Sequence, residues 1–242
     1  KTKREASKHL RNSNWPKLAE CCMQLMQLEP EDHRHCLNLA KCFGKEDQAD
    51  KQLATLTIGE RKFPEDRHVF ATHKIVVLAN GKRLSDLTEY FVTIAGDEIS
   101  ELQELIITIP NHISNEFILS HLMPAMTRIK NQDVFEGLAR LLSIRKCFKE
   151  AIALLEQVEK PTAKTWIYRG GACANLGQIK ESEKAFHEAE QLLQTDQEKA
   201  LFYRLKSDAL LRSLNHQEAY QVLRKACELN PNDKMSHQAA FT

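Results

Sequence analysis

Apolar residues recur along this chain at intervals of three or four, which is the spacing that places them on one face of an α-helix. Over residues 15–28 the stripe consists of Leu18, Cys22, Leu25 and Leu28. Similar stripes follow over 33–43, 49–58, 67–78, 84–94, 135–142 and 148–158. The pattern predicts a succession of amphipathic helices that bury one face each and expose the other.

Two sequence markers give these helices a period. Pro30-Glu31-Asp32 is repeated as Pro64-Glu65-Asp66, 34 residues further on. Proline ends a helix and aspartate caps the next one, so each marker separates a pair of helices from the following pair. Later pairs begin near residues 132, 163 and 200, and a further one near Lys234. A helix–turn–helix unit of about 34 residues therefore repeats along the chain.

The unit is clearest between Thr165 and Pro231. Large, small and turn residues alternate there in two successive units: Trp166, Gly170, Gly177, Phe186 and Ala189, then Tyr203, Ser207, Ala219, Leu223, Ala226 and Pro231. Two positions depart from the pattern, because Ser182 replaces an alanine and Leu214 stands where glycine is usual. Period and residues together resemble the tetratricopeptide repeat (TPR). The resemblance implies an all-α fold, a right-handed superhelical solenoid of about seven helix–turn–helix repeats.

The rhythm is irregular over residues 97–131. Pro110 falls inside what should be a first helix, and Pro124 lies in or near the second. This slot is interpreted as a distorted repeat, a kink in the superhelix or a junction between two arrays. The expected organisation is N-terminal repeats over 1–96, a degenerate repeat or junction over 97–131, and C-terminal repeats with a truncated last helix over 132–242.

Composition narrows the class of protein. Hydrophobic residues make up 42% of the chain and charged residues 28%, with 8 glycines and 7 prolines, which favours a folded helical protein. The formal net charge of +1 lacks the basic excess of a nucleic-acid binder. No apolar run is long enough to span a bilayer. The seven cysteines include no CxxC pair, so free thiols and a cytoplasmic location are expected.

No catalytic motif is present. The sequence has no GxSxG, P-loop, GxGxxG or HExxH pattern, so no enzymatic activity and no cofactor are expected of this stretch by itself. His33, His35, Cys36 and Cys42 form the most metal-like group, but their spacing matches no standard zinc site. No metal is predicted from these four residues.

The resemblance implies where a partner would bind. In such solenoids the first helix of each pair lines a concave surface suited to a peptide or a partner helix. Counting from the start of each unit gives the expected partner-binding residues: Arg34, Asn38, Lys41, Lys45, Glu136, Arg140, Lys164, Tyr168, Asn175, Arg204, Asp208 and Arg212. Side chains of this kind can hold a peptide backbone or a carboxylate through charge-assisted hydrogen bonds.

One TPR subfamily binds the C-terminal carboxylate of heat-shock chaperones through two lysines, two asparagines and an arginine. Lys3 and Asn38 fall at positions of that clamp. The other three positions hold Ser7, His68 and Thr72, so this specific activity is not the favoured interpretation.

Three functions are compatible with the pattern. The favoured one is a protein–protein interaction scaffold that binds a peptide or a partner protein on its concave face. The alternative is a helical regulatory or substrate-recruiting arm of a larger enzyme, because such repeats are found fused to sulfotransferase, glycosyltransferase and kinase domains. An RNA-binding helical repeat is least favoured, since Glu136 and Asp208 would place acidic groups on the binding face.

Overall fold

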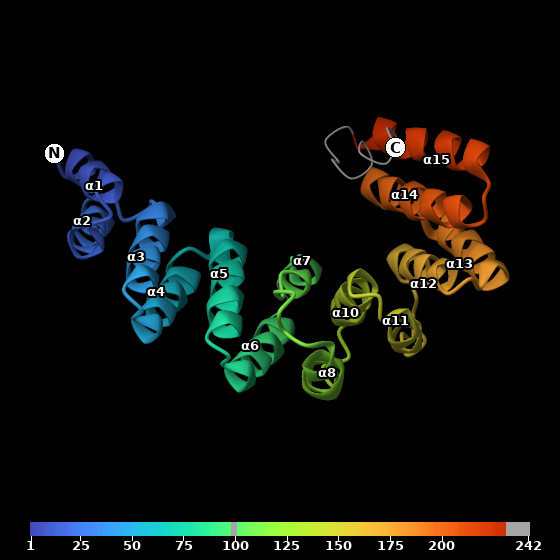
Figure 1. Cartoon of the computed structure of the whole chain (residues 1–242), viewed down its shortest axis with the longest axis horizontal. Coiled ribbons are helices and arrows are strands. Elements are labelled where there is room, and N and C mark those ends of the chain that lie inside the picture. Colours follow the sequence, from blue (N-terminus) through green and yellow to red (C-terminus); the bar gives the residue numbers. More distant parts are fainter. Residues whose placement is uncertain (98–100, 231–242) are drawn as a thin grey trace. The chain divides into compact units, whose positions relative to one another are not determined.

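A computed structural model describes residues 1–97 and 101–230 of the chain. Those residues are folded into helices joined by short turns, and they contain no β-strand (Figure 1). The predicted all-α, helical-repeat architecture is thereby confirmed. The chain divides into two compact units, an N-terminal unit over residues 1–129 and a C-terminal unit over residues 130–242.

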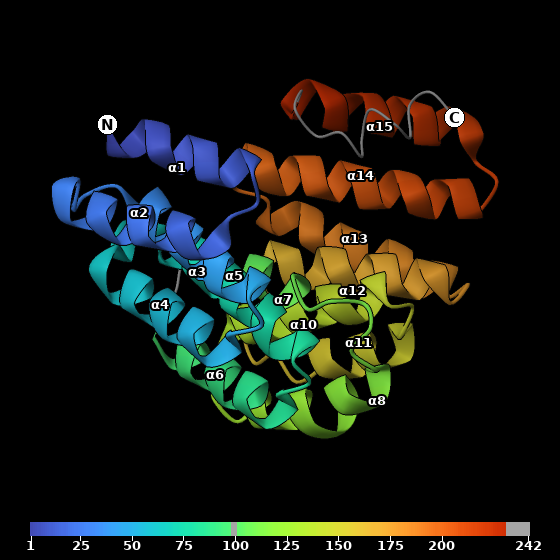
Figure 2. The ribbon, with the colours of Figure 1, turned by 60° about the vertical axis from the view of Figure 1, so that its left-hand side comes forward.

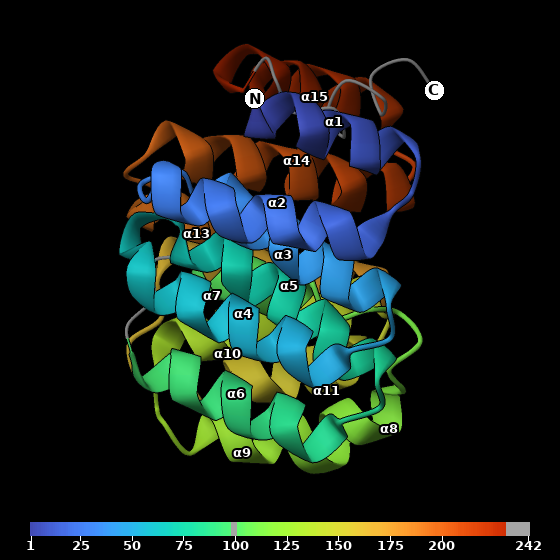
Figure 3. The same ribbon diagram turned by 90° about the vertical axis from the view of Figure 1, so that its left-hand side faces the viewer.

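The N-terminal unit begins with three pairs of helices. They are α1 (Thr2–Arg11) with α2 (Trp15–Leu28), α3 (His33–Lys45) with α4 (Ala49–Lys62), and α5 (Arg67–Asn80) with α6 (Leu84–Gly96). A 3-10 turn, η1 (Pro64–Asp66), precedes α5. Neighbouring helices from α2 to α5 pack side by side in chain order (Figure 3).

The irregular region of the sequence forms a shortened pair of helical segments. The first, α7 (Leu102–Ile107), ends before Pro110, as expected where proline disfavours helix in the residues before it. The second runs through α8 (Asn115–Phe117), a π-helical turn η2 (Ile118–Leu122) and α9 (Met123–Thr127). The wider π turn ends two residues before Pro124, which has no N–H to donate to a regular helical ladder. The boundary between the two units follows this segment.

The C-terminal unit continues the pairing with longer helices. They are α10 (Gln132–Ile144) with α11 (Phe148–Leu155), α12 (Ala163–Asn175) with α13 (Ile179–Leu192), and α14 (Asp196–Arg212) with α15 (His216–Leu229). Helices α12 to α15 lie next to one another in chain order (Figure 2). The predicted markers Pro231 and Lys234 lie outside the described residues.

Polar side chains define where several helices begin. The Asp32 carboxylate accepts a hydrogen bond from the Arg34 backbone N–H at 3.0 Å and caps α3 as predicted. Thr162 caps α12 and Thr195 caps α14, each in a reciprocal capping box with the residue three positions later. These bonds satisfy backbone donors that a helix leaves free in its first turn.

The turn inside most helix pairs contains one residue with left-handed backbone conformation. Six residues in such turns have a positive φ: Ser13, Asp47, Lys82, Lys146, Gly177 and Leu214. Only glycine adopts this conformation without steric cost. Leu214 therefore has a strained backbone at the position where the repeat pattern calls for glycine.

Close approach of neighbouring helices depends on small residues. A Cβ atom added to Gly59 would lie 2.1 Å from Cε1 of Phe70, and one added to Gly170 would lie 3.0 Å from Cε1 of Phe186. At two crossings a serine hydroxyl donates to a backbone carbonyl of the facing helix: Ser182 to Gly170 at 2.8 Å, and Ser207 to Ala219 at 3.0 Å. The hydroxyl explains how Ser182 replaces alanine without leaving a buried polar atom unpaired.

Each unit also buries one carboxylate that joins several helices. Glu60 of α4 is 8% exposed, and it accepts hydrogen bonds from the Lys74 ammonium at 3.0 Å and from the Tyr90 hydroxyl. Burial, followed by the charge of Glu60, raises the pKa of Tyr90 and keeps its hydroxyl protonated. This group links α4, α5 and α6 by polar contacts beside their apolar core.

Among the described helices, none combines enough length and apolar character to cross a bilayer.

The Leu214 turn gives a stability prediction. Leu214 is 77% exposed with a φ of 61°, so Leu214→Gly loses little packing. The change removes about 1–2 kcal/mol of backbone strain. Glycine loses more conformational entropy on folding, which offsets about 0.5–1 kcal/mol of that gain. We expect a gain in the free energy of unfolding of up to about 1 kcal/mol. Gly177→Leu, the reciprocal change at a φ of 74°, should lose about 1–2 kcal/mol. Urea unfolding of both variants tests this, and equal effects would contradict it.

The close approach at Gly59 gives a second prediction. Gly59→Ala should lower the free energy of unfolding by about 1–3 kcal/mol, because the new methyl group overlaps the Phe70 ring. Gly96→Ala is the matched control, since a Cβ at Gly96 meets nothing within 4 Å and alanine favours helix by up to about 1 kcal/mol. Thermal unfolding of both variants should show opposite shifts, or a shift for Gly59→Ala alone. Equal melting temperatures would place the tight crossing elsewhere.

Candidate functional site

A groove runs along α3 in the N-terminal unit. It consists of two adjoining cavities of about 370 and 900 Å³ that share Asn38 and Lys41 in their linings. The smaller cavity lies between α1 and α3, and Lys3 and Ser7 of α1 line it. The larger one is lined on its other side by α5. We call the two together the α3 groove. Two adjoining cavities along one helix suit an extended chain better than a compact small molecule.

Apolar side chains form much of the groove. In the smaller cavity they include Leu18, Cys22 and Leu25 of the buried core beneath α1 and α3. In the larger cavity Val76 and Val77 of α5 are half-buried and face the space beside α3. The groove therefore offers apolar contact along its length, with polar groups placed at intervals.

The cationic side chains of the groove differ in how they are paired. Lys3 bonds to Glu29 at 2.8 Å, and Arg34 forms a two-point contact with Asp32. Lys41 and Lys45 are exposed and form no ion pair with any described residue. Asn38 is also exposed, and its amide has no hydrogen-bond partner within the described ranges. Three groups on α3 are thus free to bind a ligand.

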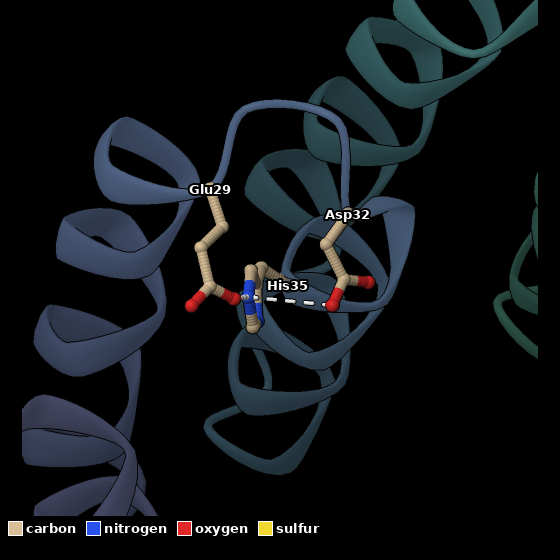
Figure 4. Close-up of side chains that lie close together, drawn as sticks. All are labelled: Glu29, Asp32 and His35. Atoms are coloured by element: carbon tan, nitrogen blue, oxygen red, sulfur yellow. Dashed lines mark hydrogen bonds and ion pairs between the residues drawn. The ribbon is translucent and has the colours of Figure 1, made fainter.

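The junction of α2 and α3 brings together two carboxylates and a histidine (Figure 4), and two of them, Asp32 and His35, also line the smaller cavity. His35 Nε2 lies 3.0 Å from Glu29 Oε2 and 3.6 Å from Asp32 Oδ2. Hydrogen bonds from Lys3 and then from His35 lower the pKa of Glu29. The Arg34 guanidinium, bonded to the carboxylate, holds the pKa of Asp32 well below its usual range.

The structure gathers the four expected binding residues of the N-terminal unit in one place. Arg34, Asn38 and Lys41 line the smaller cavity, and Asn38, Lys41 and Lys45 line the larger one. Their spacing of three or four residues places them on one face of α3.

In the C-terminal unit the expected residues are divided between surface and interior. Arg140, Lys164, Asn175, Arg204 and Asp208 are half-buried, and Arg212 is exposed. The amide of Asn175 donates within its own helix, to the carbonyl of Gly171 at 2.8 Å. Burial raises the pKa of Asp208, while the charges of Arg204 and Arg212 act against that rise.

Two expected residues take interior positions, which corrects their assignment to a partner-facing surface. Tyr168 is 6% exposed and Glu136 is 2% exposed. Oε1 of Glu136 accepts hydrogen bonds from the hydroxyls of Thr162 at 2.6 Å and Thr165 at 2.7 Å. Glu136 of α10 thus holds the capping box of α12, a pairing across 26 residues that the period alone could not indicate.

The positions compared with the chaperone clamp have local partners. The hydroxyl of Ser7 donates to the carbonyl of Lys3 at 3.0 Å, and that of Thr72 donates to the carbonyl of His68 at 2.9 Å. Hydroxyls bonded to their own helix in this way replace the amide and cationic groups that a carboxylate clamp uses. The local bonding agrees with setting that activity aside.

The metal-like group of the sequence is not brought together. His33 pairs with Asp66 at 2.8 Å, and the thiol of Cys36 donates to the Thr55 carbonyl at 3.4 Å. Cys42 lies in a different apolar cluster with Cys22, where burial raises the pKa of the Cys22 thiol to about 12. Thiols in this state are poor nucleophiles and poor ligands at neutral pH.

Sequence reasoning missed the side of the groove formed by α5. Thr72, His73, Val76 and Asn80 line it. The period places Thr72 at a clamp position, 34 residues after Asn38, but it did not indicate that this face of α5 lines a cavity.

No family model matches the chain. No curated protein matches it either. Solved structures do match: the chain is similar to tetratricopeptide repeat proteins, as its sequence pattern indicated.

Three of these structures illustrate the similarity. A tetratricopeptide repeat protein from Parabacteroides merdae is 12% identical over 99% of this chain and 96% of its own, with a TM-score of 0.44. The TPR2AB domain of yeast Sti1, solved as a pHSP90 complex, is 15% identical over 98% and 93%, with a TM-score of 0.35. YrrB, described as a TPR protein with an unusual peptide-binding site, is 14% identical over 93% and 100%, with a TM-score of 0.39.

The charged loop beside the groove gives a pH prediction. The pKa of Asp32 is lowered in the folded chain, so its stabilising contribution is complete at neutral pH and is lost as the pH falls below the ordinary carboxyl value of 3.8. Asp32→Asn keeps a side chain able to cap α3 but removes the charge. We expect the variant to lose less stability than the wild type between neutral and acidic pH.

Thermal unfolding across that pH range measures the effect. Arg34→Gln serves as the companion variant, because it removes the group that lowers the pKa of Asp32 most. Arg34→Gln should likewise lose less stability than the wild type between neutral and acidic pH. If Asp32→Asn lost as much stability as the wild type on acidification, the Asp32–Arg34 contact would not contribute to folding.

Proposed function

We propose that this chain is a protein-interaction scaffold that binds an extended segment of a partner protein in the α3 groove. The observation that carries this proposal is the pair of adjoining cavities that share Asn38 and Lys41. Helical-repeat surfaces bind peptides in this way, through a row of positions on successive helices.

The free polar groups of the groove indicate the chemistry of the segment. Lys41 and Lys45 lie one helical turn apart and face solvent without ion pairs among the described residues. They favour a ligand that carries carboxylate groups at a matching interval. The amide of Asn38 can both donate to and accept from a peptide backbone, which fixes an extended chain in register.

Apolar contact supplies the rest of the expected affinity. Val76 and Val77 on one side, and the core residues under the smaller cavity on the other, fit aliphatic side chains at alternate positions of the segment. The proposed ligand is therefore an acidic segment with interspersed aliphatic residues. Charges at the rim would mainly determine its rate of association and its specificity.

Selection from a random peptide library displayed on phage tests the proposal. Peptides that bind the wild-type chain are then measured against Lys41→Glu with Lys45→Glu. We expect selected peptides to be acidic and to lose affinity about tenfold or more on this charge reversal, which corresponds to about 1.4 kcal/mol.

Lys180→Glu with Lys184→Glu is the matched control. These lysines have the same spacing, are exposed, and lie on α13 in the C-terminal unit, so the double variant has the same net charge. It should bind the peptides as the wild type does. Equal losses in the two double variants would indicate unspecific attraction to positive charge, and peptides unaffected by either would place the binding surface elsewhere.

A further inference from the structure

Glu29, Asp32 and His35 bring one imidazole and two carboxylates together at one place in the N-terminal unit. The three residues come from the end of α2, the cap of α3 and the first turn of α3 (Figure 4). One donor atom from each lies within 4.8 Å of the other two. His35 is buried at 8% exposure, and Glu29 and Asp32 are half-buried.

Two separations between these donor atoms are close to those found around a small metal ion. His35 Nε2 lies 3.0 Å from Glu29 Oε2 and 3.6 Å from Asp32 Oδ2. Ligands at about 2.0–2.2 Å from Zn²⁺, at angles near 90–110°, are roughly 3.0–3.4 Å apart. The first of the two separations falls in this range and the second is slightly longer, while all three donor atoms lie within 4.8 Å of one another.

We propose that Glu29, Asp32 and His35 bind a divalent first-row transition-metal ion, with Zn²⁺ as the reference ion. One imidazole nitrogen and two carboxylate oxygens are ligands that such ions accept. Binding would join the end of α2 to the start of α3, and would leave the remaining coordination positions to water or to a ligand. The proposal does not depend on the α3 groove binding a partner.

Two cations of the chain compete with the metal for the same carboxylates. Lys3 pairs with Oε1 of Glu29, which leaves Oε2 to face His35. The Nη2 atom of Arg34 lies 2.7 Å from Oδ2 of Asp32, so it would have to leave that oxygen. The Arg34 side chain is 73% exposed and can move into solvent. We therefore expect moderate affinity in the wild type and higher affinity once Arg34 is neutralised.

Titration with Zn²⁺ in a calorimeter, under reducing conditions, tests the site. The wild type should bind one ion in this cluster, and Glu29→Gln and His35→Gln should each weaken binding about tenfold or more. Arg34→Gln should tighten binding several-fold. His33→Gln is the matched control, because His33 is two residues away on α3 but pairs with Asp66 outside the cluster. It should leave the affinity unchanged.

Co²⁺ as a spectroscopic probe separates this site from the cysteines. Nitrogen and oxygen ligation gives weak visible bands, whereas binding to thiolates gives strong near-ultraviolet charge-transfer absorption, and the chain contains seven cysteines. Circular dichroism of each variant confirms that it is folded. Absence of saturable binding in the wild type, thiolate absorption at the first equivalent, or equal losses in His33→Gln and His35→Gln would each overturn the proposal.

Discussion

The contact on which the rest of the fold depends is the close approach of neighbouring helices at residues with almost no side chain. Gly59 lies under the ring of Phe70, and Gly170 lies under that of Phe186. If these helices were held further apart, the apolar stripes of both would lose contact along their length, and dispersion attraction falls steeply with distance. Because each pair packs mainly on the next, one such crossing affects the position of every helix that follows it within its unit.

Buried polar groups then fix how the helices are aligned. Glu60 and Glu136 are each nearly inaccessible, and each accepts hydrogen bonds from two residues of neighbouring helices. Apolar stripes tolerate small slips along a helix axis, whereas a buried carboxylate that lost its donors would incur a large desolvation cost. These residues therefore contribute to a unique alignment more than to net stability, which buried charges rarely increase.

The sequence allowed the fold to be predicted well because the determinants are local and periodic. Helical stripes, proline stops and the Asp32 cap each involve residues close in the chain, and the groove residues Asn38, Lys41 and Lys45 follow from the phase of a single helix. Glu136 was misplaced for the opposite reason. Its donors, Thr162 and Thr165, come from the next helix pair, and no periodic rule gives their distance from Glu136. The contact of His35 with Glu29 was not predicted either, because it depends on the conformation of the loop after α2.

The pairing of charges explains why the α3 groove fits a binding role. Lys3 and Arg34 carry positive charge, but Glu29 and Asp32 already neutralise it. Lys41 and Lys45 keep theirs, and they do so beside the half-buried Val76 and Val77 of α5. An acidic ligand would gain attraction from both lysines without breaking an existing ion pair among the described residues, and would bury apolar surface as it bound. The groove thus combines two sources of affinity at little cost in lost internal contacts.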